Sequence, residues 1–68
     1  MDEIESIEGR VTEALPATLF RVKTTAGKEV LSYLGGKMRI HKIKVLIGDK
    51  VLVELDPYGG KGRIIKRL

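Results

Sequence analysis

Alternation of apolar and polar residues, repeated along a short chain, is the feature that most restricts the fold of this sequence. A period of two is typical of β-strands with one buried face. It recurs in five segments of the 68-residue chain, at 7–13, 18–24, 28–34, 50–56 and 63–67. A chain of this size buries only about 60% of its unfolded surface. Because the sequence has no cysteine, no disulfide adds stability, and we expect the strands to share one core.

Turn-forming residues separate these segments. Pro16 follows the first segment, and proline cannot donate to a strand ladder. Between the third and fourth segments, residues 37–42 hold one apolar anchor, Met38, which predicts a single short helical turn. Residues 43–47 form an apolar cluster that we expect to fold beneath the sheet.

Five short strands with a small helix between the third and fourth indicate an all-β OB-fold, a five-stranded, partly open Greek-key barrel that binds oligonucleotides. Closing a sheet into a barrel removes its exposed edges. We expect the inner face to be built from ten residues: Ile7, Val11, Phe20, Val22, Val30, Leu34, Val51, Val53, Leu55 and Ile64.

Basic residues are concentrated in the second half of the chain. Residues 1–34 carry six acidic and four basic side chains, a net charge of −2, whereas residues 35–68 carry three acidic and nine basic ones, a net charge of +6. This asymmetry favours a polyanionic partner, most simply a nucleic acid. A solvated basic surface without a ligand is the alternative.

The sequence offers little for catalysis or for metal binding. His41 is the only histidine and there is no cysteine, so we expect no metal site and no cofactor. A histidine base needs a nucleophile within hydrogen-bond reach, and Ser32 falls on the expected inner face of its strand. The glycine-rich run 59–62 lacks the spacing of a phosphate-binding loop. We therefore expect that the protein is not an enzyme.

The N-terminus is acidic, and we expect residues 1–5 to form a flexible tail on a single domain that spans residues 1–68. It lacks the basic and apolar regions of a signal peptide. No apolar run approaches the roughly 20 residues that cross a bilayer. We expect a cytoplasmic protein, or one in an organelle stroma if it is organelle-encoded, without membrane contact.

Several short motifs occur in a fixed order along nearly the whole chain. They are Gly36-Lys37-Met38-Arg39, Gly48-Asp49-Lys50-Val51, Val53-Glu54-Leu55, Pro57-Tyr58 and Lys61-Gly62-Arg63-Ile64. Together with the length of the chain, they resemble bacterial and organellar translation initiation factor one. The chain departs from the family pattern at 40–42, at the shortened loop containing Gly59-Gly60, and at Tyr33, where the family has a histidine.

The resemblance implies an OB-fold factor that binds the small ribosomal subunit at the decoding (A) site, through ribosomal RNA and a neighbouring ribosomal protein. Such a factor blocks premature entry of transfer RNA and cooperates with initiation factors two and three. We expect a monomer. The alternative is a general single-stranded RNA-binding OB-fold, similar to cold-shock RNA chaperones.

Twelve residues are candidates for RNA contact. In and after the expected helix they are Lys37, Arg39, His41, Lys42 and Lys44, and near the last strand they are Lys61, Arg63, Lys66 and Arg67. Arginine binds phosphate bidentately, whereas lysine acts as a point charge. Alternation predicts that Arg63 and Arg67 share a strand face, with Lys66 on the opposite face.

The second and third strands supply the remaining candidates, Arg21, Lys23 and Tyr33. A basic and aromatic surface is how OB-folds hold nucleic acid, because bases stack on the rings. We interpret Tyr58 differently, as a packing residue that holds its loop in place.

Overall fold

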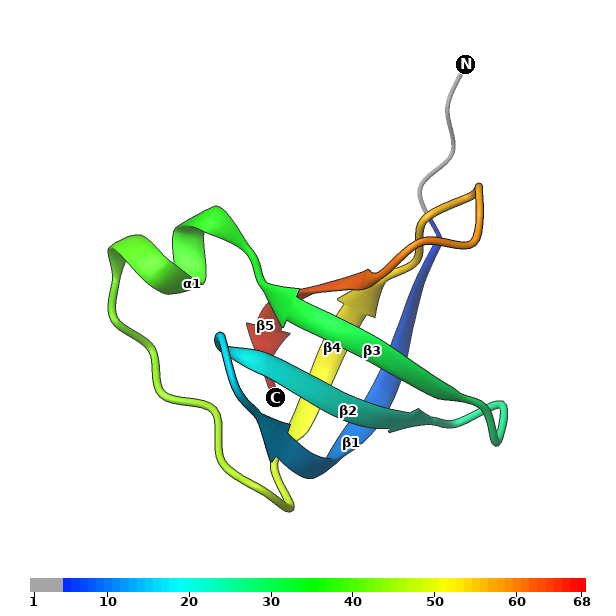
Figure 1. The fold of residues 1–68 in the computed structure, drawn as a ribbon, viewed down its shortest axis with the longest axis horizontal. Coiled ribbons are helices and arrows are strands. Elements are labelled where there is room, and N and C mark those ends of the chain that lie inside the picture. Colours follow the sequence, from blue (N-terminus) through cyan, green and yellow to red (C-terminus); the bar gives the residue numbers. More distant parts are fainter. Residues whose placement is uncertain (1–4) are drawn as a thin grey trace.

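Five strands close into a barrel in this computed structural model, which describes residues 5–68 (Figure 1). The elements are β1 (Ser6–Leu15), β2 (Leu19–Thr24), β3 (Glu29–Leu34), α1 (Gly36–Ile40), β4 (Lys50–Glu54) and β5 (Gly62–Arg67). Each strand overlaps a segment where the alternation predicts it, and the helix lies between the third and fourth strands. The OB-fold prediction is therefore confirmed.

The strand order β1-β2-β3-β5-β4 closes because β4 also pairs with β1. All neighbouring strands are antiparallel except β3 and β5, which run parallel. The register of β1 against β2 shifts between Val11 and Glu13, and such a bulge bends a strand and increases its twist. β1 and β5 share no backbone pairing in this ring, so their outer faces point in different directions.

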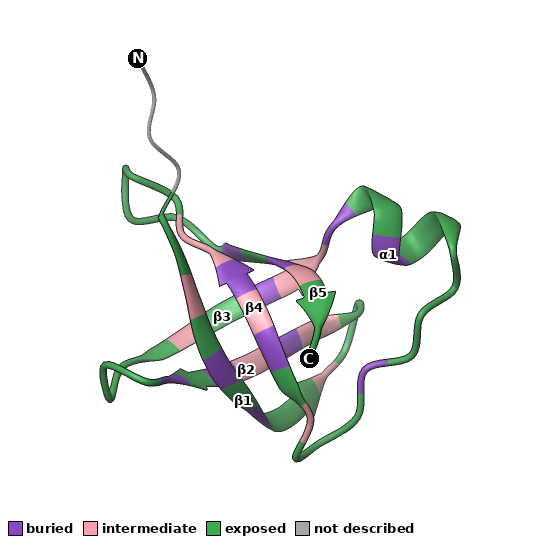
Figure 2. Ribbon diagram, turned by 180° about the vertical axis from the view of Figure 1, so that it is seen from behind, coloured by how far each residue is buried: buried purple, intermediate pink, exposed green. Residues whose placement is uncertain are grey.

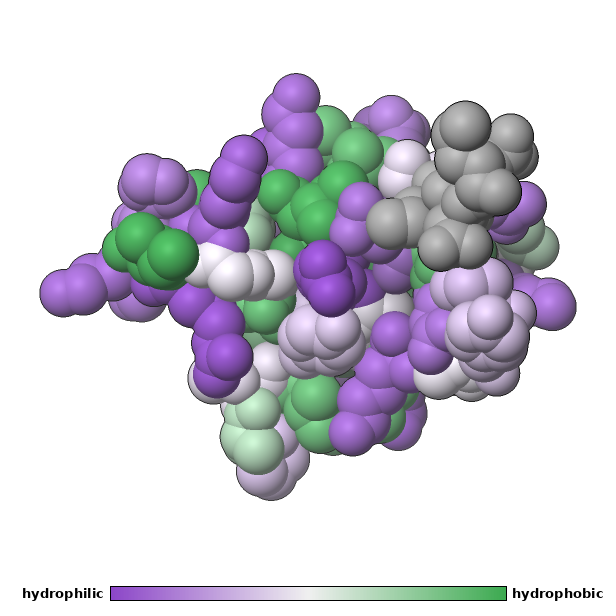
Figure 3. All heavy atoms as spheres, turned by 90° about the horizontal axis from the view of Figure 1, so that it is seen from above, coloured by the Kyte–Doolittle hydropathy of each residue, from purple (hydrophilic) through white to green (hydrophobic). Residues whose placement is uncertain are grey.

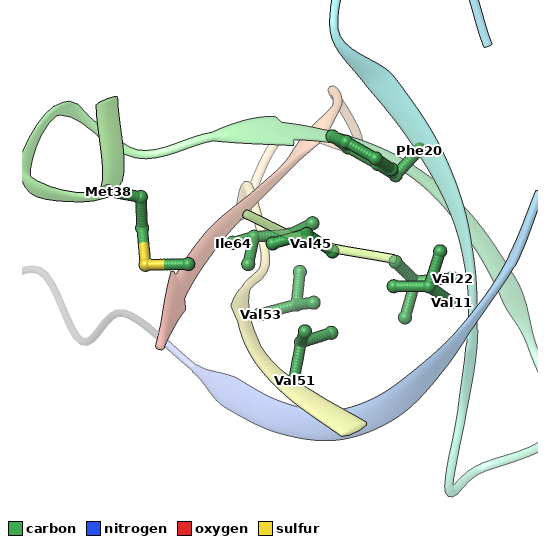
Figure 4. Close-up of a cluster of buried hydrophobic side chains, with 8 residues drawn as sticks. All are labelled: Val11, Phe20, Val22, Met38, Val45, Val51, Val53 and Ile64. Carbon is green, nitrogen blue, oxygen red and sulfur yellow. The ribbon is translucent and has the colours of Figure 1, made fainter. Parts of the chain in front are cut away.

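Small branched side chains dominate the core. Its buried residues are Val11, Phe20, Val22, Met38, Val45, Val51, Val53 and Ile64 (Figure 4). Six of these eight belong to the predicted inner face, and Leu34 and Leu55 pack against the cluster while only partly buried. Ile7 and Val30, by contrast, are only half-buried. Both lie second in their strands, near the rim of the barrel, where fewer neighbours cover a side chain.

The apolar segment 43–47 does not fold beneath the barrel as predicted. Only Val45 is buried, at 8% exposure, whereas Ile43, Leu46 and Ile47 are 37%, 55% and 64% exposed. A turn before β4 explains this, because the Leu46 N–H donates to Asp49 Oδ2 at 2.8 Å and the Asp49 N–H donates to the Leu46 carbonyl at 3.0 Å. The turn keeps the two apolar residues after Val45 on the surface.

The expected acidic tail falls mainly on residues 1–4, which lie outside the described residues. Glu5 is described, and its carbonyl accepts a 2.8 Å hydrogen bond from the Leu55 N–H. The start of β1 is therefore tied to the end of β4. In the described part of the chain, the only helix is far too short to cross a membrane.

Candidate nucleic-acid interface

The helix α1 is attached to the barrel through β5. Met38 is its buried residue, at 3% exposure, and the Gly35 N–H donates to the Ile64 carbonyl at 2.8 Å. A Cβ at position 35 would lie 2.9 Å from that same carbonyl oxygen, so only glycine allows this close approach. The rest of α1 is exposed (Figure 2). The helix therefore presents Lys37 and Arg39 to solvent beside β5.

Lys37 and Arg63 meet at one hollow, although 26 positions separate them in the sequence. The hollow measures about 400 Å³ and lies between α1 and the sheet, with Glu54 of β4 in its wall. Seen from above, hydrophilic side chains extend from the end of the molecule that carries α1, on the left of the view, with apolar surface among them (Figure 3). The fold thus brings Lys37, a candidate from the helix, close to Arg63, a candidate from the last strand.

Arg63 is held by two neighbouring strands. Tyr33 of β3 lies directly opposite it in the parallel pairing, and Arg63 Nε donates a long hydrogen bond of 3.4 Å to the Tyr33 hydroxyl. The guanidinium carbon lies 5.9 Å from the ring centroid, within the range of a cation–π contact. On the other side, Arg63 Nη1 is 3.7 Å from Glu54 Oε1. The side chain is therefore oriented while remaining exposed.

The contacts with Tyr33 and Glu54 act on the pKa of Arg63, which is positively charged at neutral pH with or without them. The hydrogen bond to Tyr33 raises the pKa of Arg63 above its ordinary value, the charge interaction with Tyr33 raises it further, and Glu54 adds a smaller effect in the same direction. An arginine that is always charged and already oriented is suited to bind a phosphate group.

A second hollow continues the surface on the far side of Arg63. It measures about 220 Å³, and its walls include Tyr33, Lys61 and Arg63 together with Asp56 and Pro57. Arg63 and its ion-pair partner Glu54 therefore line both hollows. We call Tyr33, Lys37, Lys61 and Arg63 the α1–β5 surface.

The predicted face relation in β5 is wrong. Leu52 pairs with Lys66 while the next residue, Val53, pairs with Ile64, so Ile65 is an extra residue in β5. This bulge reverses the alternation beyond it. Lys66 consequently shares the outer face with Arg63, whereas Arg67 lies opposite the buried Val51 and pairs with Asp49 at 3.2 Å.

The register of β2 against β3 places Arg21, Lys23 and Tyr33 on one outer face, as predicted, and their contact with RNA stays a prediction. Tyr33 lies opposite Leu19, two residues before Arg21, and its ring also contacts Arg63. Arg21 Nη1 pairs with Glu13 Oε1 at 2.9 Å, an exposed ion pair of small energetic value. Lys23 lies two residues farther along β2.

The segment after α1 folds back on the helix. The His41 N–H donates to the Lys37 carbonyl at 3.0 Å, and the Ile43 N–H donates to the Met38 carbonyl at 3.0 Å. Lys42 has a φ of 52°, in the left-handed region that reverses the chain direction. His41, Lys42 and Lys44 are all exposed, and their role in RNA contact stays a prediction.

Comparison with known proteins decides the family. A family model described as translation initiation factor 1A / IF-1 matches residues 1–68. The chain belongs to this family. The translation initiation factor of the IF-1 type from the Wolbachia endosymbiont strain TRS of Brugia malayi is 47% identical, with a TM-score of 0.80 over 96% of this chain and 78% of that one. The protein is therefore a translation initiation factor of the IF-1 family, which implies the small ribosomal subunit as its partner.

A second solved structure has a similar barrel. YjeQ from Thermotoga maritima is 26% identical, with a TM-score of 0.77, and the match covers 94% of this chain but only 23% of that chain. This chain thus spans about a quarter of the Thermotoga protein.

Initiation factors are not a class of enzymes. Within residues 5–68, no group of three metal-ligating side chains is placed to hold an ion.

Two residues near this surface differ from what the sequence indicates. Tyr58 is 94% exposed, so our interpretation of it as a packing residue is wrong. Its N–H donates to Asp56 Oδ1 at 2.9 Å, which fixes the backbone but leaves the ring free. Glu54 is not among the sequence candidates, and only its register opposite Arg63 shows that it orients this arginine.

Proposed function

We propose that this initiation factor binds the decoding (A) site of the small ribosomal subunit through the α1–β5 surface. Arg63 carries the proposal, because Tyr33 and Glu54 hold its guanidinium between two hollows that Lys37 and Lys61 also line. Contacts to phosphate position a protein on RNA without reading its sequence. Shape and backbone recognition of this kind suits a folded RNA.

The remaining parts of the proposal follow from the family. Occupying the A site, the factor excludes transfer RNA, contacts a neighbouring ribosomal protein, and cooperates with initiation factors two and three. It acts as a monomer, and residues 1–68 work as one RNA-binding domain. Because a ligand shifts an equilibrium only by its differential affinity, the factor favours the subunit conformation that it binds more tightly.

The central test is binding of labelled protein to purified small subunits at several salt concentrations, with excess single-stranded RNA as competitor. We expect saturable one-to-one binding that weakens with salt and survives the competitor. Binding that is abolished by the competitor would instead identify a general single-stranded RNA-binding protein. That alternative needs aromatic stacking platforms, and Tyr58 is the only aromatic ring among residues 5–68 that is almost fully exposed.

A second test addresses site occupancy. Bound factor should compete with an elongator transfer RNA for the A-site codon on small subunits. The variant Arg39→Ala should bind more weakly by about 1.5–3 kcal/mol, the range for hydrogen bonds to charged groups. The same variant should unfold as cooperatively as the parent, because Arg39 is exposed on α1. Unchanged affinity would remove Arg39 from the interface.

A further inference from the structure

The barrel has an open strand edge in the first half of β3. This strand pairs with β2 along residues 29–33, but it pairs with β5 only along residues 32–34, and the two strands diverge toward the start of β3 (Figure 1). Residues 29–31 therefore have a partner strand on one side only, and we call them the β3 edge. Closure of a barrel otherwise removes such edges.

Backbone groups on the β3 edge point away from β2. The Thr24 N–H donates to the Lys28 carbonyl at 2.8 Å, and hydrogen-bonded and non-hydrogen-bonded residues alternate along an antiparallel pair. Val30 is therefore bonded to β2, whereas the N–H groups of Glu29 and Leu31 point to the open side. Unpaired groups of this kind are what an added strand uses when it joins a sheet.

The loop between β4 and β5 borders the β3 edge without pairing with it. Its backbone hydrogen bonds within the described residues join Leu55 to Glu5 and Gly59 to Asp56, and none reaches the edge. A hollow of about 540 Å³ lies between the loop and the edge. Gly59 and Gly60 line this hollow and have no side chains to fill it.

The walls of this hollow combine apolar surface with balanced charge. The apolar residues are Val30, Leu31 and Leu55, and the charged ones are Lys28, Lys61, Glu29 and Asp56. Two lysines and two acids give no net charge, so the hollow lacks the positive charge that a phosphate backbone needs. None of the three aromatic residues of the chain lines it, so a base has no ring on which to stack. RNA therefore does not fit this hollow.

An extended polypeptide fits it better. A peptide strand that adds to a sheet edge gains main-chain hydrogen bonds, while its alternate side chains enter pockets beside the edge. From Lys28 to Leu31 the backbone extends about 10 Å, enough to pair with about three residues of such a strand. Its side chains would meet the apolar surface of Leu31 and Leu55, with wall charges of both signs beside them.

We propose that the β3 edge binds an extended segment of a small-subunit protein, which adds to the barrel as a further strand. The position of the edge supports this source, because Asp56 and Lys61 line both this hollow and the one beside Arg63. A protein at the β3 edge thus lies at the margin of the α1–β5 surface. This inference rests on the proposed function, which brings the factor beside a ribosomal protein.

Hydrogen exchange on the factor bound to purified small subunits tests strand addition. In the free protein the amide protons of Glu29 and Leu31 should exchange quickly, because no strand bonds them. In the complex both should exchange at least about tenfold more slowly. Ala26 lies in the turn between β2 and β3 and is the control, because its amide should exchange quickly in both states.

The result separates this inference from the proposed function. Unchanged exchange at Glu29 and Leu31 in factor that is bound to subunits would overturn strand addition. Failure of the factor to bind subunits at all would instead count against the proposed function.

Two substitutions at position 29 separate backbone pairing from side-chain contact. Glu29→Pro and Glu29→Ala both remove the carboxylate, but only proline also removes the N–H on the open side. Proline is tolerated at the first residue of a strand, and Glu29 begins β3. The subunit affinity of Glu29→Pro should be at least about fivefold lower than that of Glu29→Ala. Equal affinities would contradict the inference, and the exchange measurement decides if the proline variant does not fold.

Crosslinking identifies the partner of the edge. The chain has no cysteine, so Lys28→Cys gives a unique thiol beside the hollow for a photo-crosslinker. On purified small subunits the label should transfer to a ribosomal protein. Transfer to ribosomal RNA alone would overturn the assignment of a protein to this edge.

Discussion

Arg63 on β5 and Arg10 on β1 are both exposed arginines on the outer wall of one barrel, yet their surroundings differ. Arg63 is oriented by a carboxylate and an aromatic ring, whereas Arg10 has only a backbone carbonyl and lies between two lysines. Orienting a side chain before binding lowers the entropic cost of binding. Unpaired charge instead acts over distance and speeds association. We therefore expect Arg63 to contribute mainly to the geometry of a complex, and Arg10 to contribute mainly to long-range attraction of an anionic partner.

The face that carries Arg63 and the face that carries Arg10 are supported by the same core. A cavity in that core should therefore have a large effect on the free energy of unfolding. Val53 is fully buried between the two faces, and Val53→Ala should lower the free energy of unfolding by about 2 kcal/mol through reduced burial and a residual cavity. Chemical denaturation measures this decrease. Affinity per folded molecule should stay unchanged at both faces, and a selective decrease at one face would show that the barrel does not hold them as one rigid body.

Removal of Arg63 should affect only the α1–β5 surface. Arg63→Ala should weaken subunit binding by about 1.5–3 kcal/mol, the range for hydrogen bonds to charged groups. Arg63→Lys should recover only part of this affinity, because lysine lacks the planar fork. Titration of labelled protein into small subunits gives both values. Full recovery with lysine would mean that Arg63 acts as a simple point charge.

Tyr33→Phe tests whether orientation of Arg63 by the Tyr33 hydroxyl contributes to subunit binding. The change removes the acceptor of the 3.4 Å hydrogen bond but keeps the ring beneath the guanidinium. We expect binding to weaken by about 0.5–1 kcal/mol, less than with Arg63→Ala. The same titration measures it, with Tyr58→Phe as the matched hydroxyl deletion. Equal effects of the two changes would argue against a special role for the Tyr33 hydroxyl.

The last expected effect concerns stability alone, at the turn between β1 and β2, away from both faces. Ala17 and Thr18 have φ values of 63° and 55°, and a β-branched residue is strained in this region. Thr18→Gly should raise the free energy of unfolding by up to about 1 kcal/mol, as measured by thermal unfolding. Subunit affinity should not change, and a change would reveal a contact that involves this turn.

The sequence predicts the barrel well because its strands follow a period of two and its turns contain proline and glycine. Strand boundaries move by a few residues, as in β1, which continues to Leu15. The apolar segment 43–47 misleads, because hydrophobicity alone does not show that the turn at Asp49 leaves Ile47 exposed. Local pattern predicts which residues alternate, and tertiary context decides how deeply each is buried.

The candidate site is predicted less completely, because it depends on strand register. The partnership of Tyr33 with Arg63 arises from the parallel pairing of β3 and β5, which no local pattern encodes. The bulge at Ile65 likewise reverses the faces of Lys66 and Arg67.

The parallel pairing of β3 with β5 also has a consequence for how the protein matures. This pairing joins residues about 30 positions apart, as in Tyr33 and Arg63, and such non-local contacts form slowly because a long loop must close first. Chains are synthesised from the N-terminus, so β5 is the last strand of this barrel to be made. A nascent chain that has not reached residue 63 has no Arg63 and no closed barrel. A chain therefore becomes able to bind through the α1–β5 surface only after synthesis has passed β5 and the barrel has closed.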